Sequence, residues 1–168
     1  ILRMNLKETD IALTDSSEKI NLKIFHQLLT DKLVLYAKAK EAAPKLLSKD
    51  DGGHCFFKQY FSLLNDVLTI VNGQIRKINF NYQGSLTQGL KSSILNVFDS
   101  SINRSECLIR GLLRDHNMII KFIRKNLKHN SFHLNSNDSL DAIAEILQLH
   151  IEMTWMLRDQ LIKIIYFK

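Results

Sequence analysis

Apolar residues recur at intervals of three, four and seven along most of the chain, and this spacing predicts amphipathic helices. Four long helices are expected, at about residues 16–47, 55–80, 102–128 and 139–166. Their apolar stripes supply the candidate core, which includes Ile24, Leu28, Leu35, Phe57, Phe61, Leu64, Val71, Ile75, Leu108, Leu112, Ile119 and Ile123. Ser16 or Ser17 can cap the first helix, and Pro44 is expected to disturb its last turn because proline lacks a backbone donor.

The segments between the helices complete the predicted fold. A short helix is expected at about residues 86–97, in the connection between the second and third long helices. No segment alternates apolar and polar residues as a half-buried strand does. The pattern therefore predicts an all-α four-helix bundle with a crossover connection, built from residues 16–168 and preceded by an N-terminal tail at 1–15.

Composition narrows the class of protein. The 168 residues suffice for one domain, and 45% hydrophobic with 24% charged residues is ordinary for a soluble globular chain. No apolar run approaches the roughly 20 residues that span a bilayer. Cys55 and Cys107 are too few for a disulfide framework, so we expect small buried thiols and a cytoplasmic location. The net charge of +6 is compatible with a polyanionic partner.

Several segments resemble one family in order and spacing. The last helix carries His150 followed by Trp155-Met156-Leu157-Arg158, and the third predicted helix carries an Asp-His pair at the end of Ile109–His116. Gln27–Asp31 with Leu35-Tyr36, and Gly84-Ser85-Leu86, add further matches. Together these segments resemble the mini-ferritins that protect bacterial DNA during starvation, the Dps family, over about residues 27–161.

This resemblance implies a ferritin-like four-helix subunit that assembles into a hollow homo-oligomer, in that family a dodecamer. Its members oxidise ferrous iron, usually with hydrogen peroxide, and store the ferric mineral inside the shell. Some members also bind DNA. Iron, DNA and an active paralogue in a mixed shell are therefore the partners that the resemblance suggests.

The ligands of the family's oxidation site are missing from the matching positions. Imidazole and carboxylate are the iron ligands expected there. The family's His-Trp falls on Ala43-Pro44, and its remaining ligands fall on Lys58, Ser62, Gly73 and Lys77. A shift of one residue in the second helix puts Phe57, Phe61, Asn72 and Arg76 there instead. We therefore expect the standard oxidation site to be lost, with Lys58 and Lys77 repelling a cation if they face one place.

Three carboxylates open the last helix, at Asp138, Asp141 and Glu145. By resemblance, Asp141 and Glu145 fall where the family lines an acidic pore for cation entry. The alternative is a helix-terminal role, with Asp138 as the cap and Asp141 stabilised by the positive end of the helix dipole. Both interpretations stay open, and one residue can serve both.

Five cations follow one face of the third helix at spacings of four, seven, four and three: Arg110, Arg114, Lys121, Lys125 and Lys128. At 3.6 residues per turn they lie within an arc of about 60°, with Arg124 at its margin. This cationic ridge could contact phosphates, or it could be an ordinary solvated helix face. The segment through residue 18 has two basic and four acidic residues, so a basic N-terminal tail is not what would hold DNA.

The remaining candidates have structural interpretations. His116 and His150 are interpreted as packed or hydrogen-bonded helix histidines rather than metal ligands, and Trp155 as a core or subunit contact. Two functional hypotheses follow. The first is a mini-ferritin shell for iron handling and stress protection that has lost its oxidation centre. The second is a noncatalytic shell or scaffold that binds DNA.

Overall fold

The computed structural model describes residues 5–47, 52–78, 93–95, 105–130 and 137–166. Four helices account for nearly all of them: α1 (Asn5–Leu47), α2 (Gly52–Ile78), α4 (Ser105–Asn130) and α5 (Asn137–Tyr166). No strand occurs within these ranges. The prediction of an all-α four-helix bundle is confirmed. The short helix predicted at residues 86–97 falls almost entirely outside the described residues, and residues 93–95 are not helical.

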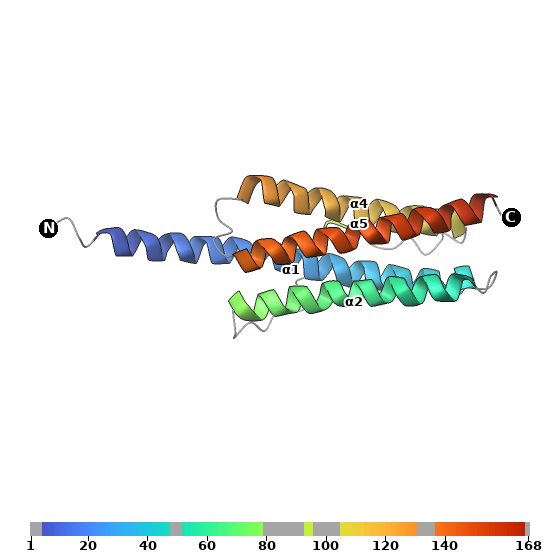
Figure 1. The fold of residues 1–168 in the computed structure, drawn as a ribbon, viewed down its shortest axis with the longest axis horizontal. Coiled ribbons are helices and arrows are strands. Elements are labelled where there is room, and N and C mark those ends of the chain that lie inside the picture. Colours follow the sequence, from blue (N-terminus) through green and yellow to red (C-terminus); the bar gives the residue numbers. More distant parts are fainter. Residues whose placement is uncertain (1–4, 48–51, 79–92, 96–104, 131–136, 167–168) are drawn as a thin grey trace.

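The order in which the helices pack defines the connectivity. Figure 1 shows that α1 and α5 run in one direction along the bundle and α2 and α4 in the other. Contacts join α1 to α2, α4 to α5, α2 to α5 and α1 to α4, so every packed pair is antiparallel. Because α2 and α4 run the same way, the chain between residues 78 and 105 must cross the length of the bundle. One such crossover is the connectivity of ferritin-like bundles.

The core consists of the apolar stripes of the four helices. Among the predicted core residues, Leu35 and Leu64 are fully buried, and Phe61 is half-buried. An aromatic group extends the core along α2, where Tyr60 lies between Phe56, Phe57 and Phe61 with ring centroids 5.8–6.5 Å from its own. Burial of these stripes is the main force that holds the bundle together.

The helix boundaries differ from the prediction mainly at the first helix. It begins at Asn5 rather than near Ser16, so part of the segment predicted as a tail is helical. In Figure 1 this N-terminal part of α1 extends beyond the ends of the other helices. Pro44 does not end the helix, which continues to Leu47. Its position in the last turn explains this, since only one intrahelical hydrogen bond is lost there.

The burial predicted for the two cysteines is wrong. Cys55 and Cys107 are exposed rather than buried, because each lies near the first turn of its helix, on the side away from the core. Trp155 was predicted to make a core or a subunit contact, and its exposure of 68% excludes the core of this chain. None of the described helices has a stretch both long enough and apolar enough to cross a membrane.

Candidate functional site

An acidic groove lies between the C-terminal half of α2 and the start of α5. It has a volume of about 340 Å³ and contains all three carboxylates predicted from the sequence, Asp138, Asp141 and Glu145. The α2 side is lined by Thr69, Ile70, Gly73, Gln74 and Lys77. The spacing of the carboxylates explains why they meet. Residues three and four apart on a helix lie on one face, which here is the face beside α2.

Lys77 is the one cation among the groove's lining residues. Its Nζ lies 3.2 Å from Oδ2 of Asp138, and both side chains are exposed. The side-chain amide of Gln74 also donates to the backbone carbonyl of Asp138, at 3.4 Å. Asp141 and Glu145 have no ion pair among the described residues. Three carboxylates facing one ammonium group give the groove a net negative charge.

The helix-terminal interpretation of the same residues receives a correction. α5 begins at Asn137, so Asp138 lies in the first turn rather than at the capping position. A carboxylate in the first turn still interacts favourably with the positive end of the helix dipole. The groove and the helix terminus therefore share Asp138, while Asp141 and Glu145 lie farther along the groove.

The positions that the resemblance matches to the family's oxidation ligands do not form one site within this chain. Lys58 and Lys77 are both exposed on α2, about 28 Å apart along its axis. They can act on one cation only if a second chain brings opposite ends of two α2 helices together. Ser62 and Gly73 are exposed as well, whereas Ala43 is buried. Among the described residues, no group of three or more His, Cys, Asp or Glu side chains could hold a metal ion.

A chain of hydrogen bonds crosses the centre of the bundle and joins three helices. The hydroxyl of Tyr60 on α2 lies 2.7 Å from Nε2 of His116 on α4. Nδ1 of His116 lies 2.8 Å from Nδ1 of His150 on α5. All three side chains are buried. The interpretation of His116 and His150 as hydrogen-bonded helix histidines is confirmed.

The direction of this chain follows from the donors available. The buried Tyr60 hydroxyl needs an acceptor, and His116 Nε2 is its partner. His116 then carries its proton on Nδ1 and donates it to Nδ1 of His150, which must be unprotonated. Both histidines are therefore neutral, and their Nδ1 atoms cannot both carry protons at this distance.

Burial reinforces the neutral state of this chain. Desolvation lowers the pKa of His150 to about 3. Desolvation, followed by the proximity of His150, lowers the pKa of His116 well below its ordinary value. Desolvation and the Asp115 charge raise the pKa of the Tyr60 hydroxyl far above its usual range. The chain is therefore an uncharged structural connection near neutral pH.

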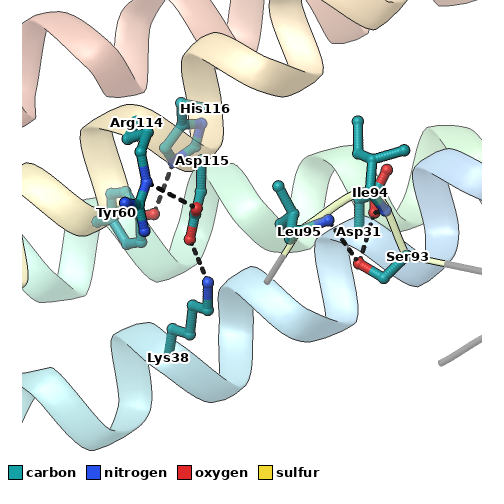
Figure 2. Close-up of polar contacts among 9 residues, drawn as sticks. All are labelled: Asp31, Lys38, Tyr60, Ser93, Ile94, Leu95, Arg114, Asp115 and His116. Atoms are coloured by element: carbon teal, nitrogen blue, oxygen red, sulfur yellow. Dashed lines mark hydrogen bonds and ion pairs between the residues drawn. The ribbon is translucent and has the colours of Figure 1, made fainter. Parts of the chain in front are cut away.

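A buried ion pair lies next to this chain. Lys38 on α1 donates from Nζ to Oδ2 of Asp115 on α4 at 2.6 Å, and Figure 2 shows the pair beside Tyr60 and His116. Oδ1 of Asp115 is buried without a hydrogen-bond partner in the described structure, and Nε of Arg114 lies 4.0 Å from it. Together with the histidine chain, this pair links all four helices through polar contacts.

A second buried carboxylate attaches the crossover to α1. Oδ1 of Asp31 accepts from the Ser93 hydroxyl at 2.8 Å and from the Ile94 amide at 3.0 Å, as Figure 2 shows. Oδ2 accepts from the side-chain amide of Gln27 at 3.1 Å. Burial raises the pKa of Asp31, and the three hydrogen bonds act in the opposite direction. Asp31 thus fixes residues 93–95 against the bundle.

No model of a known protein family matches the chain, and no curated protein matches it either. Membership of the mini-ferritin family is therefore a proposal.

The cationic ridge on α4 faces solvent along its whole length. Arg110, Arg114, Lys121, Lys125 and Lys128 are all exposed, and so is Arg124 at its margin. Glu106 pairs with Arg110, at 2.8 Å. No acidic residue occurs between His116 and Lys128, so the C-terminal half of the ridge has no carboxylate within that part of α4.

Sequence reasoning located the groove residues and the ridge but not the polar contacts inside the bundle. His116 and His150 were visible as single residues, and the resemblance even aligned them with family motifs. Nothing in the spacing showed that Tyr60 would meet His116, or that Lys38 would meet Asp115. Those contacts join residues 56 and 77 positions apart, so they depend on how the helices pack.

Proposed function

We propose that this chain is a subunit of a ferritin-like shell that takes up cations, with iron as the principal cargo, without the family's standard oxidation centre. The observation that carries the proposal is the acidic groove. Three carboxylates from one helix end face a single lysine in a surface depression large enough for hydrated ions. Carboxylate oxygens suit hydrated ferrous ions, and a negatively lined cleft raises the local cation concentration.

Other features are consistent with this proposal. The single crossover gives the bundle ferritin-like connectivity. The exposed thiols of Cys55 and Cys107 suit a reducing cytoplasm, where such thiols remain free. The missing ligands point to holding or admitting iron rather than oxidising it, either alone or in a mixed shell with an active paralogue.

Aerobic ferrous loading of the purified protein, followed by metal analysis, tests this function. We expect iron retention above a heat-denatured control. Asp141→Asn with Glu145→Gln should lower the uptake rate on the order of tenfold, because cation attraction by the groove is lost. Asp66→Asn with Glu152→Gln is the matched control, since it removes the same charge from exposed positions outside the groove. Iron retention no higher than in the denatured control would end the proposal.

A second candidate function is binding of nucleic-acid phosphates by the ridge on α4. The observation that favours it is the exposed run of Lys121, Arg124, Lys125 and Lys128, in a stretch of α4 without acidic residues. Lysine and arginine contacts to phosphates release counterions, so such binding weakens steeply as salt rises.

Gel-shift titration with duplex DNA at two salt concentrations tests the ridge. Replacing Arg114, Lys121 and Lys125 by Glu should weaken binding strongly and reduce its salt dependence by about one unit of slope per lost phosphate contact. The control replaces Lys23, Lys40 and Lys58 by Glu, which changes the net charge equally at exposed positions on α1 and α2. Equal loss in both variants would mean that total charge, not the ridge, governs binding.

A further inference from the structure

The C-terminal half of α5 carries apolar side chains on the side that faces away from the bundle. Trp155 is 68% exposed, Ile162 52% and Tyr166 76%. At 3.6 residues per turn these three lie within an arc of about 40°, and the core residues Met153 and Leu157 lie on the opposite face. We call Trp155, Ile162 and Tyr166 the outer stripe. Large apolar side chains aligned on one exposed face mark an interaction surface.

The charged residues beside the outer stripe indicate what covers it. Asp159 and Lys163 lie on one flank of the stripe, and within the chain Nζ of Lys163 is 2.7 Å from Oδ2 of Asp159. Both side chains remain more than half exposed, so they are accessible to another molecule. Leu161 lies midway between them in the sequence. If a second copy of this flank runs antiparallel and is centred at Leu161, its Lys163 faces Asp159 of the first copy and its Asp159 faces Lys163.

We propose that the outer stripe pairs with the outer stripe of a second copy of this chain, antiparallel and centred at Leu161. The two-fold axis of such a pair is perpendicular to both helices, so the charged flanks of the two copies lie on the same side of the seam. Asp159 of each copy therefore lies beside Lys163 of the other. Trp155 and Tyr166 lie at nearly equal distances on either side of Leu161. Each tryptophan therefore lies near the tyrosine of the other copy.

The energetics favour this occupant. Exposed tryptophan and tyrosine are the side chains that most often dominate interface energies, and here each occurs twice by symmetry. The two ion pairs contribute little affinity alone, but they fix the antiparallel direction and the register. A parallel two-fold pair would put the two charged flanks on opposite sides of the seam, where Asp159 and Lys163 of the two copies could not pair. The pairing rests on the proposed function in one respect: in a shell, it would be one of several contacts between subunits.

Disulfide trapping in the full chain tests the geometry. In a background where Cys55 and Cys107 are Ser, Ile162→Cys places a thiol next to the two-fold axis, so mild oxidation should convert most chains to covalent dimers. Ala144→Cys is the matched control. It is exposed on the same side of α5, but its two copies would be about 50 Å apart in the pair. Cross-linking of Ile162→Cys no greater than that of Ala144→Cys would overturn the proposal.

Charge reversal tests the register. By sedimentation velocity, Asp159→Lys and Lys163→Asp should each weaken association about tenfold, and the double variant should restore it. Trp155→Ala should weaken association tenfold or more. Failure of the double variant to recover, or a wild-type chain that stays monomeric, would overturn the pairing, whatever else binds the stripe. Neither readout needs iron. If the chains pair but retain no iron, the proposed iron-handling shell is wrong and the pairing stands. If iron is retained but Ile162→Cys is not trapped as a dimer, the pairing is wrong and the proposed function stands.

Discussion

At the scale of single residues, the most consequential feature is that Tyr60, His116 and His150 are buried in an uncharged hydrogen-bonded chain. One added proton would reverse the chain, so that His150 donates to His116 and His116 donates to Tyr60. The Tyr60 hydroxyl would then lack an acceptor among the described residues. A second proton would place two N–H groups against each other at the 2.8 Å contact between α4 and α5. Acid should therefore loosen the bundle at this point.

The stability of the protein should fall as the pH falls below about 6.5. The folded-state pKa values of His116 and His150 lie below the ordinary value, so the unfolded chain takes up their protons first. Each histidine then removes about 1.4 kcal/mol of stability per pH unit until its folded pKa is reached, near 3 for His150. Above pH 7 the effect disappears. Urea denaturation between pH 7.5 and 4.5 measures it.

Substitutions can distinguish the loss of stability caused by these histidines from the loss caused by other groups that titrate in acid. His150→Gln should lower stability at pH 7.5, because the contact with His116 is lost, yet its stability should fall less steeply with acid. His54→Gln changes an exposed histidine that is in water whether or not the chain is folded. The expected slope for that variant is the wild-type slope. An unaltered slope in His150→Gln would show that this histidine does not stay neutral in the fold.

The ion pair between Lys38 and Asp115 should be costly to break from one side. Lys38→Met leaves the buried Asp115 carboxylate without its cation, which typically costs about 3–5 kcal/mol. Lys38→Met combined with Asp115→Leu removes both charges and should recover most of the loss. Arg110→Met is a suitable control, since its partner Glu106 is exposed and such pairs contribute about 0.3–0.5 kcal/mol. Chemical denaturation decides; equal losses in the single and double variants would contradict this account.

At the scale of elements, the sequence predicted most of the helices and which of their faces are buried. Leu64 and Ile123 were assigned to the core from periodicity alone, and both are fully buried. Asp141 and Glu145 were placed together by the family resemblance, and they line one groove. Where periodicity carries no information, prediction failed. Cys55 was assigned to the interior by residue type, but helix register puts it outside.

The attachment of the crossover to α1 gives a prediction at this scale. Asp31→Ala removes the acceptor of the Ile94 amide and the Ser93 hydroxyl, so the amide of Ile94 should lose most of its protection from hydrogen exchange. Global stability should fall by about 2–3 kcal/mol, since buried donors are left unsatisfied. Asp66→Ala, at an exposed position on α2, should leave Ile94 protected. Unchanged exchange at Ile94 in Asp31→Ala would mean that other contacts fix residues 93–95.

At the scale of the whole molecule, the described structure combines a packed interior with three chemically distinct surfaces. The interior joins all four helices through apolar stripes and a few polar contacts. The groove, the ridge on α4 and the outer stripe on α5 lie on the outside, each with its own chemistry. A side chain that binds a partner can look like an ordinary solvated residue in one chain. This is why periodicity located the ridge without deciding what it contacts.

The length of α1 allows the extent of the bundle to be tested. The first core residue described in α1 is Ile24, whereas the helix begins at Asn5 and its N-terminal part extends past the other helices. Deleting residues 1–15 should lower the helical signal in circular dichroism while leaving the thermal midpoint within a few degrees, because this part of α1 extends past the other helices. Deletion through residue 28 should destabilise the bundle strongly, since it also removes the buried Ile24, Phe25 and Leu28. If the shorter deletion lowered the midpoint as much, the N-terminal part of α1 would have to pack against another surface, either in the same chain or in a second copy.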